Sequence, residues 1–250
     1  MTTPILPGCE PYSTKNGPLG VLVLHGFTGN PTSMRSLAER LARGGFSVEL
    51  PRLPGHGTSV EDMMTTSWAD WSSAALAAYD ELALRSSKVA VVGLSMGGGL
   101  TAYIGERRDP AALVFINPVV MKPGDELVDG LKELIDSGLS SIESIGSDIK
   151  KEGAAEASYA ATPLGCVLSL FEGLVEVHRD LGKISAPSLL LSSREDHVVT
   201  SDNGDEVVAN SSGSVQRIWL ENSYHVATLD NDQEIVESST LVFLDTVLQS

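Results

Sequence analysis

The sequence contains few residues that could hold a metal or a cofactor. Its two cysteines, Cys9 and Cys166, form neither a C-x-x-C pair nor a disulfide framework, and we interpret both as packing residues. None of the five histidines is paired at metal-ligand spacing. A dinucleotide-binding G-x-G-x-x-G motif is excluded because Ser95 stands where its second glycine belongs. The sequence therefore predicts no metal site and no cofactor.

Basic residues are also scarce. The chain has 17 Lys and Arg residues against 33 Asp and Glu residues, for a net charge of −16. Nucleic acids and anionic membrane surfaces favour positively charged partners, so this balance argues against both. No apolar run reaches the roughly 18 residues of a membrane span, and residues 1–18 lack the features of a signal peptide. We expect a cytoplasmic protein without stable membrane insertion.

The chain does contain a regular alternation of apolar strands and helical patterns. Buried strands are expected at Gly20–Leu24, Phe46–Leu50, Val89–Leu94, Ala112–Ile116, Ser188–Leu191 and Val215–Leu220. Helices are expected at Pro31–Arg43, Ser67–Leu84, Met96–Arg108, Asp202–Asn210 and Asp232–Leu248. This order predicts an α/β fold in one domain of 250 residues, with a mostly parallel central sheet and helices on both faces.

The alternation is interrupted at about residues 118–186. This stretch has no convincing strand for the sheet and contains short amphipathic pieces such as Glu126–Ser137 and Leu164–His178. Ligands of open α/β sheets bind at the carboxyl ends of the strands, where an insertion of this size would lie. We expect a small cap over the active site. The alternative is an ordinary set of helices packed on a face of the sheet.

A serine follows the third expected strand in the pattern Gly93-Leu94-Ser95-Met96-Gly97. A G-x-S-x-G match between a strand and a helix is typical of a sharp turn that exposes the serine hydroxyl. Glycines two residues on either side remove side chains that would collide in such a turn. We predict that Ser95 is a nucleophile at a helix N-terminus, where free amides face developing negative charge.

A serine nucleophile needs a base, and histidines follow three of the expected strands. They are His25, His197 and His225. In hydrolase sheets the serine is followed along the chain by the acid and then by the histidine, which selects His225. We interpret His56, in a Gly/Pro-rich loop, as structural or solvated.

The acid is expected in the turn after the preceding strand. Asp196 occupies that turn and could accept a hydrogen bond from the imidazole of His225. Glu195 is a close competitor, because one position of turn geometry decides between the two. Asp230 is disfavoured because it follows His225, and we expect it to cap the last helix.

The first expected strand ends at the glycine-containing loop His25–Gly29. A loop at this edge can turn a backbone amide toward a neighbouring site. We predict that the amides of Phe27 and Met96 form an oxyanion hole. A plain turn is the alternative for this loop.

Four segments of the sequence carry a family resemblance, in the order found in that family. They are Val23–Gly29, Gly93–Gly98, Glu195–Val199 and Asn222–Asp230. Together they resemble the bacterial monoacylglycerol lipase and small carboxylesterase family of the α/β-hydrolase fold, over nearly the whole chain. The resemblance implies a triad of Ser95, Asp196 and His225.

The stretch Ser144–Lys150, with Glu156 beyond it, also resembles the bacilli-type monoacylglycerol lipases. This resemblance implies that Ile145 lines the substrate passage and that Glu156 binds glycerol hydroxyls. A carboxylate could accept hydrogen bonds from the two free hydroxyls of a monoester. The alternative for Glu156 is a solvated surface carboxylate.

We predict a serine hydrolase that cleaves small-molecule carboxylic esters, foremost monoacylglycerols, through an acyl-enzyme. A general short-to-medium-chain carboxylesterase is one alternative. A thioesterase or C–C bond hydrolase on the same scaffold is another, because fold does not fix function. A binding module without activity is disfavoured by the intact serine, acid and histidine positions.

Overall fold

A computed structural model describes residues 3–144 and 146–249 of the chain. Its centre is a seven-stranded sheet with the order β1-β3-β2-β4-β5-β8-β9. Neighbouring strands pair in parallel, except that the edge strand β1 is antiparallel to β3. The sheet strands are β1 (Tyr12–Ser13), β2 (Leu19–Leu24), β3 (Ser47–Leu50), β4 (Lys88–Leu94), β5 (Ala112–Ile116), β8 (Ser188–Ser193) and β9 (Val215–Leu220). The expected α/β class and mostly parallel sheet are confirmed.

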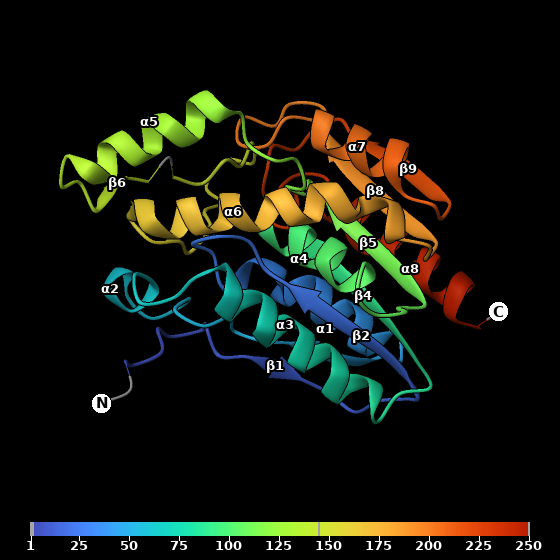
Figure 1. The fold of residues 1–250 in the computed structure, drawn as a ribbon. Coiled ribbons are helices and arrows are strands. Elements are labelled where there is room, and N and C mark those ends of the chain that lie inside the picture. Colours follow the sequence, from blue (N-terminus) through green and yellow to red (C-terminus); the bar gives the residue numbers. More distant parts are fainter. Residues whose placement is uncertain (1–2, 145, 250) are drawn as a thin grey trace.

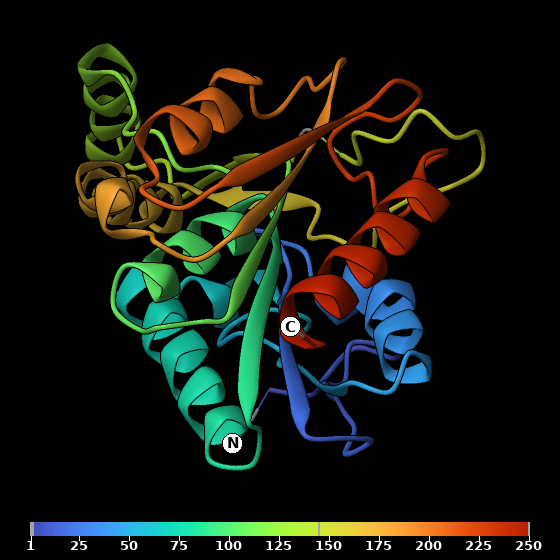
Figure 2. The ribbon, with the colours of Figure 1, turned by 90° about the vertical axis from the view of Figure 1, so that its right-hand side faces the viewer.

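Helices cover both faces of this sheet (Figure 1). The α-helices are α1 (Arg35–Arg43), α2 (Val60–Met63), α3 (Trp68–Ala83), α4 (Met96–Gly105), α5 (Asp125–Asp136), α6 (Leu164–Asp180), α7 (Asp202–Asn210) and α8 (Gln233–Gln249). Two 3₁₀ turns, Pro31–Met34 and Leu181–Lys183, precede α1 and follow α6. Figure 2 shows α1 and α8 on one side of the sheet, and α3, α4 and α6 on the other.

Each face of the sheet has its own hydrophobic core. One core joins Trp71 of α3, Leu100 of α4 and Leu174 of α6 to one face of the sheet. The other joins Leu37 of α1 and Leu244 of α8 to the opposite face. Because β4 and β5 lie in the middle of the sheet and are covered on both faces, their sequences read as continuous apolar runs.

The insertion between β5 and β8 contributes no strand to the central sheet. It contains α5, α6 and two short strands, β6 (Ser141–Glu143) and β7 (Ala161–Pro163). These strands pair with each other as a separate antiparallel sheet, so the expectation that this stretch adds no strand to the central sheet is confirmed. The small separate sheet was not expected. Strands of three residues leave too short an alternation of side chains to be recognised in a sequence.

Two other elements carry no clear sequence signal. They are the two-residue edge strand β1 and the single-turn helix α2, which Ser59 caps at its N-terminus. The other expected elements are present, with α4 ending at Gly105 rather than Arg108. Ser67 is the N-cap of α3, in a capping box with Asp70. Among the described residues, no helix has the length and apolar character that a membrane span requires.

The turn after β4 leaves no room for side chains at its glycines. A Cβ atom at Gly93 would lie 2.0 Å from the carbonyl oxygen of Gly97, and one at Gly97 would lie 2.3 Å from the carbonyl oxygen of Leu24. The first clash is the expected collision across the turn. The second involves the end of the neighbouring strand β2, so both glycines permit close packing of backbone on backbone.

We expect Gly93→Ala to destabilise the fold by about 1–3 kcal/mol, toward the upper end, because the clashing atoms are backbone and cannot yield. The measurement is the free energy of unfolding in urea. Gly130→Ala is the matched control, since a Cβ at this exposed helical position meets nothing within 4 Å. The control should gain about 0.5–1 kcal/mol. If Gly93→Ala and Gly130→Ala changed the free energy of unfolding equally, the turn would have room for a side chain at Gly93 and this explanation would be wrong.

Candidate active site

Ser95 lies in the turn between β4 and α4, with φ 56° and ψ −119°. This backbone region is rarely adopted by residues other than glycine. Hydrogen bonds hold the turn on both sides: the Ser95 amide donates to Ile116 (3.1 Å), and the Ser95 carbonyl accepts from the amides of Gly98 (2.8 Å) and Val119 (3.1 Å). The serine is thereby fixed at the N-terminus of α4, as the sequence predicts.

Positive φ angles gather at this edge of the sheet. Within the described residues, the non-glycine positions concerned are Ser95 after β4, Thr28 after β2 (57°) and Asn117 after β5 (41°). Each lies just beyond the carboxyl end of a strand. Strained backbone conformations concentrate at sites of function in folded proteins, so this edge is the first place to seek an active site.

A carboxylate–imidazole pair lies at the same edge. His225 Nδ1 is 2.8 Å from Asp196 Oδ2, and the two side chains are only 8% and 3% exposed. The other oxygen of Asp196 accepts the amides of Val198 (2.9 Å) and Val199 (2.8 Å). Because an ionised carboxylate can only accept, Nδ1 of His225 carries the proton and Nε2 is left as the acceptor.

Glu195, the competing candidate for the acid, has no hydrogen bond to His225 among the described residues. Its carboxylate forms an exposed ion pair with Lys150 at 3.0 Å. The two carboxylates are adjacent in sequence, but that of Asp196 contacts the imidazole and that of Glu195 lies on the surface. The structure brings Asp196, and not Glu195, to His225.

The remaining histidines near this edge have other surroundings. His25 and His56 are fully buried with ring centroids 5.1 Å apart. Burial lowers the pKa of His25 to about 3 and the pKa of His56 to about 4, so both are neutral near pH 7. His25 Nε2 accepts the amide of Leu53 at 3.2 Å. These contacts match the structural interpretation of His56 and leave neither imidazole exposed for proton transfer.

His197 is mostly exposed, and its Nδ1 lies 2.8 Å from the carboxylate of Asp148. The hydrogen bond to that carboxylate raises the pKa of His197. His197 therefore pairs with the insertion rather than with Ser95 or Asp196.

A cavity of about 300 Å³ joins the strand ends to the insertion. Ser95 and His225 both line it, together with Phe27 and Met96. Among its described residues, the insertion contributes five apolar and six polar side chains to the lining, with Asp148 and Glu156 among the polar ones. The apolar lining residues that belong to the insertion are Val119, Ile142, Val167, Leu170 and Phe171. An apolar cavity with a few convergent polar groups is the usual form of a small-molecule site.

The two residues whose amides are expected to form an oxyanion hole, Phe27 and Met96, line the same cavity as Ser95. The loop that carries Phe27 packs so closely that a Cβ at Gly26 would come within 3.3 Å of Ser95 Cβ. Met96 is the first residue of α4, whose N-terminal amides have no acceptor within the helix. Among the hydrogen bonds of residues 3–144 and 146–249, the Phe27 amide also has no acceptor. Both amides are thus available to a ligand.

Glu156 is half-buried and lines the cavity. Its carboxylate packs against the loop after β2, where a Cβ at Gly29 would come within 2.8 Å of Oε1. Burial raises the pKa of Glu156, against the opposing effect of the nearby His225. This environment differs from the solvated surface that was the alternative. Ile145, the other residue implied by the resemblance, lies outside the described residues.

Sequence reasoning missed the side chains that tie the strand ends together. Asn117 donates to Ser193 Oγ (2.9 Å) and to the carbonyl oxygen of His225 (2.8 Å), and it accepts the amide of Ser193 (2.7 Å). It therefore links β5 to β8 and to the loop after β9. An asparagine directly after a buried strand was the available signal, because asparagine tolerates positive φ.

The expected role of Asp230 as a helix cap is wrong. Its carboxylate is 1% exposed and accepts the amides of Lys150, Lys151, Tyr224 and Asn231 at 2.7–2.8 Å. Among the described hydrogen bonds, none joins this carboxylate to an amide of α8. A buried carboxylate is stabilised by several such donors, and here they come from two loops rather than from the helix.

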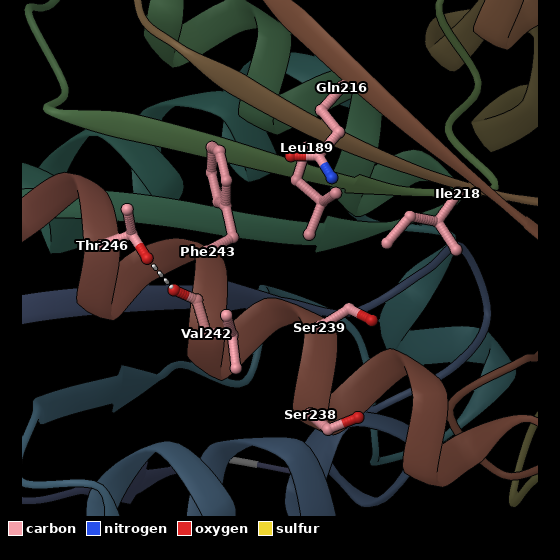
Figure 3. Close-up of a pocket in the computed structure, with 8 residues that line it drawn as sticks. All are labelled: Leu189, Gln216, Ile218, Ser238, Ser239, Val242, Phe243 and Thr246. Atoms are coloured by element: carbon pink, nitrogen blue, oxygen red, sulfur yellow. Dashed lines mark hydrogen bonds between the residues drawn. The ribbon is translucent and has the colours of Figure 1, made fainter.

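Figure 3 shows a second hollow, of about 310 Å³, between β9 and α8. Its polar lining consists of Gln216, Ser238, Ser239 and Thr246. The rest of the lining is aliphatic or aromatic, and no titratable side chain is present in it. None of the predicted site residues that the structure describes lines this hollow, so the candidate chemistry belongs to the cavity at the strand ends.

Comparison with known proteins agrees with this architecture. Residues 21–238 match the model of the alpha/beta hydrolase family. A thermostable monoacylglycerol lipase of Bacillus sp. (strain H-257) is 41% identical over 249 residues, covering 96% of both chains. A carboxylesterase of Bacillus subtilis (strain 168) is 26% identical over 240 residues, covering 94% of this chain and 96% of the relative.

Solved structures give the same result. A structure from the work on LipS and LipT, two metagenome-derived lipolytic enzymes, superposes with a TM-score of 0.92 at 38% identity, covering 97% of this chain and all of that one. The monoacylglycerol lipase of Paleococcus ferrophilus shares the fold, with a TM-score of 0.75 at 19% identity over 94% and 98% of the two chains. With the family match over most of its length and this sheet order, the chain belongs to the alpha/beta hydrolase family.

Proposed function

We propose that this protein hydrolyses carboxylic esters through an acyl-enzyme formed on Ser95. The observation that carries the proposal is the 2.8 Å contact of His225 Nδ1 with Asp196, beside a cavity that His225 shares with Ser95. The lipolytic and esterase relatives support the same chemistry. Proton transfer by a histidine oriented by a buried carboxylate is the general means of activating a serine.

In the first half of the reaction, His225 Nε2 takes the proton of Ser95 as Oγ attacks the carbonyl carbon. The resulting oxyanion is held by the amides of Phe27 and Met96, each worth about 2.7–4 kcal/mol by analogy with single-donor losses in other hydrolases. Collapse breaks the bond to the alcohol oxygen, and His225 returns the proton to the leaving alcohol. Water then attacks the acyl carbon by the same route, which releases the acid and restores Ser95. Asp196 holds the imidazole tautomer throughout.

The favoured substrate is a monoacylglycerol. The Bacillus relative with 41% identity is a monoacylglycerol lipase, and this chain carries a half-buried carboxylate, Glu156, on the wall of its cavity. Such a carboxylate can accept from the free glycerol hydroxyls and would be left without partners by a diester. The apolar side chains of the insertion are suited to the acyl chain, and the insertion acts as the cap of a single domain. The cytoplasmic location stays a prediction from the sequence.

A general carboxylesterase is the second candidate, favoured by the carboxylesterase relative at 26% identity. In that case Glu156 would have no role in recognition of the alcohol. The two candidates share the triad and differ only at the alcohol side of the cavity.

Ser95→Ala should lower kcat by about 10⁴-fold or more, because no other group supplies the acyl acceptor. The measurement is hydrolysis of a monoacylglycerol, with labelling of Ser95 by an organophosphonate as a second readout. Ser87→Ala, an exposed serine just before the other end of β4, is the control and should be unchanged. Activity of Ser95→Ala within tenfold of the wild type would place the nucleophile elsewhere.

Asp196→Asn should lower kcat by about 10⁴-fold, because an amide no longer selects the productive tautomer of His225. Glu195→Gln is the matched control: it is adjacent in sequence and its ion pair with Lys150 is exposed. We expect it to retain activity within threefold. The opposite order of damage, measured in the same kcat assay, would assign the acid to Glu195.

Glu156→Gln should lower the preference for a monoacylglycerol over the matching diacylglycerol by about tenfold, since one charged acceptor is lost. The ratio of the two kcat/KM values, at equal acyl chain, is the quantity to measure. The variant should hydrolyse a short simple ester at the wild-type rate. An unchanged ratio would favour the general carboxylesterase.

A further inference from the structure

A short piece of the insertion crosses the ends of β8 and β9. We refer to Ser147–Lys151 as the clasp segment. One oxygen of Asp148 accepts the amides of His225 and His197, each at 3.1 Å, and the other oxygen contacts the His197 ring at 2.8 Å. The carbonyl oxygen of Asp148 accepts the amide of Val226 at 3.1 Å. One residue thus binds the backbone of both loops that carry the proposed acid and base.

The far end of the clasp segment is fixed to the loop after β9. The amides of Lys150 and Lys151 donate to the buried carboxylate of Asp230, at 2.7 and 2.8 Å. The same carboxylate accepts the amide of Tyr224 at 2.8 Å, directly before His225. The backbone of the clasp segment next to Asp148 is therefore anchored to the buried carboxylate of Asp230, and this anchor helps to fix Asp148 over the two loops.

Asp148 is charged near neutral pH. Burial acts to raise its pKa, but hydrogen bonds from the His197 ring and from the amides of His197 and His225 outweigh burial and lower it. Its side chain is 15% exposed and lines the cavity. Hydrogen bonds from backbone amides to a carboxylate are charge-assisted and stronger than those to a neutral acceptor.

The loops that follow β8 and β9 lie beyond the strand pairing, which ends at Ser193 and Leu220. The contact of Asp196 with His225 joins these loops, so its geometry depends on how the loops are held. A misplacement of about 1 Å at a reacting group can cost about 100-fold in rate. A carboxylate that binds both backbones limits such displacement.

We propose that Asp148 is a positioning residue. It holds the loop after β9, which carries the proposed base His225, in a fixed position relative to the loop after β8, which carries the proposed acid Asp196. The inference rests on the proposed function, because it gives Asp196 and His225 their roles. It adds that the insertion, besides lining the cavity, aligns the catalytic pair through one side chain. Asp148 itself takes no part in proton transfer to the substrate.

The test compares Asp148→Leu, Asp148→Asn and Lys150→Gln. The leucine removes every side-chain acceptor at a similar volume. The asparagine keeps one oxygen for the His225 amide. Lys150→Gln is the control on the same segment, since it removes the exposed pair with Glu195 and the ammonium over the Tyr224 ring, and keeps the backbone amide that Asp230 accepts.

For Asp148→Leu we expect kcat for a monoacylglycerol and the rate of organophosphonate labelling of Ser95 to fall about 10- to 100-fold, with KM within threefold. Asp148→Asn should recover a large part of this loss, and Lys150→Gln should match the wild type. Thermal unfolding is measured on all three proteins. If the role of Asp148 were purely structural, activity would fall only in proportion to the loss of folded protein. The remaining folded protein would then keep the kcat of the wild type.

Wild-type kcat and labelling rates in Asp148→Leu would overturn the positioning role. A change in KM alone would overturn it too, and so would unfolding of both Asp148 variants at the assay temperature. Failure of the wild-type protein to label at Ser95 would instead reject the proposed function. The two failures are therefore distinguishable in one experiment.

Discussion

The strained turn at Ser95 is the constraint on which the rest of the site depends. A non-glycine residue at positive φ costs of order 1–3 kcal/mol and persists only where its surroundings fix it. Here the amide of Ser95 is held by Ile116 and its carbonyl by Val119, both from the neighbouring chain segment around the end of β5. Gly93 and Gly97 let the backbone close around the turn. A central parallel sheet is what brings these segments within reach.

Buried polar side chains perform the same task for the loops beyond the strands. Backbone groups there have no strand partner, and leaving them unpaired in the interior would be costly. Asn117 satisfies groups of β8 and of the His225 loop, and Asp230 accepts four backbone amides. The loops at this edge of the sheet are therefore held by a few buried polar side chains rather than by additional secondary structure.

The insertion has a double connection to this edge. Its helix α6 packs on the sheet face with α3 and α4, while its β6/β7 pair and clasp segment reach the cavity. Glu156, which is proposed to recognise the substrate, and Asp148, which is proposed to hold the loops, are close neighbours in the sequence. Changes in this stretch would alter the alcohol pocket and the alignment of the site together.

The sequence by itself determined six of the seven strands of the central sheet and the turn at Ser95, because apolar periodicity and glycine spacing are local signals. It also led to the proposed roles of Ser95, Asp196 and His225 through their order along the chain. It favoured Asp196 over Glu195 as the acid, with one position of turn geometry between them, and it gave Asp230 the wrong role. Only the tertiary structure showed that Asp196 contacts His225 while Glu195 pairs with Lys150, and it revealed the contacts of Asn117 and Asp148. Such residues bind backbone groups far along the chain, as Asp148 binds the His225 amide 77 positions away. A bond of that kind depends on how the chain folds back and leaves no local pattern to read.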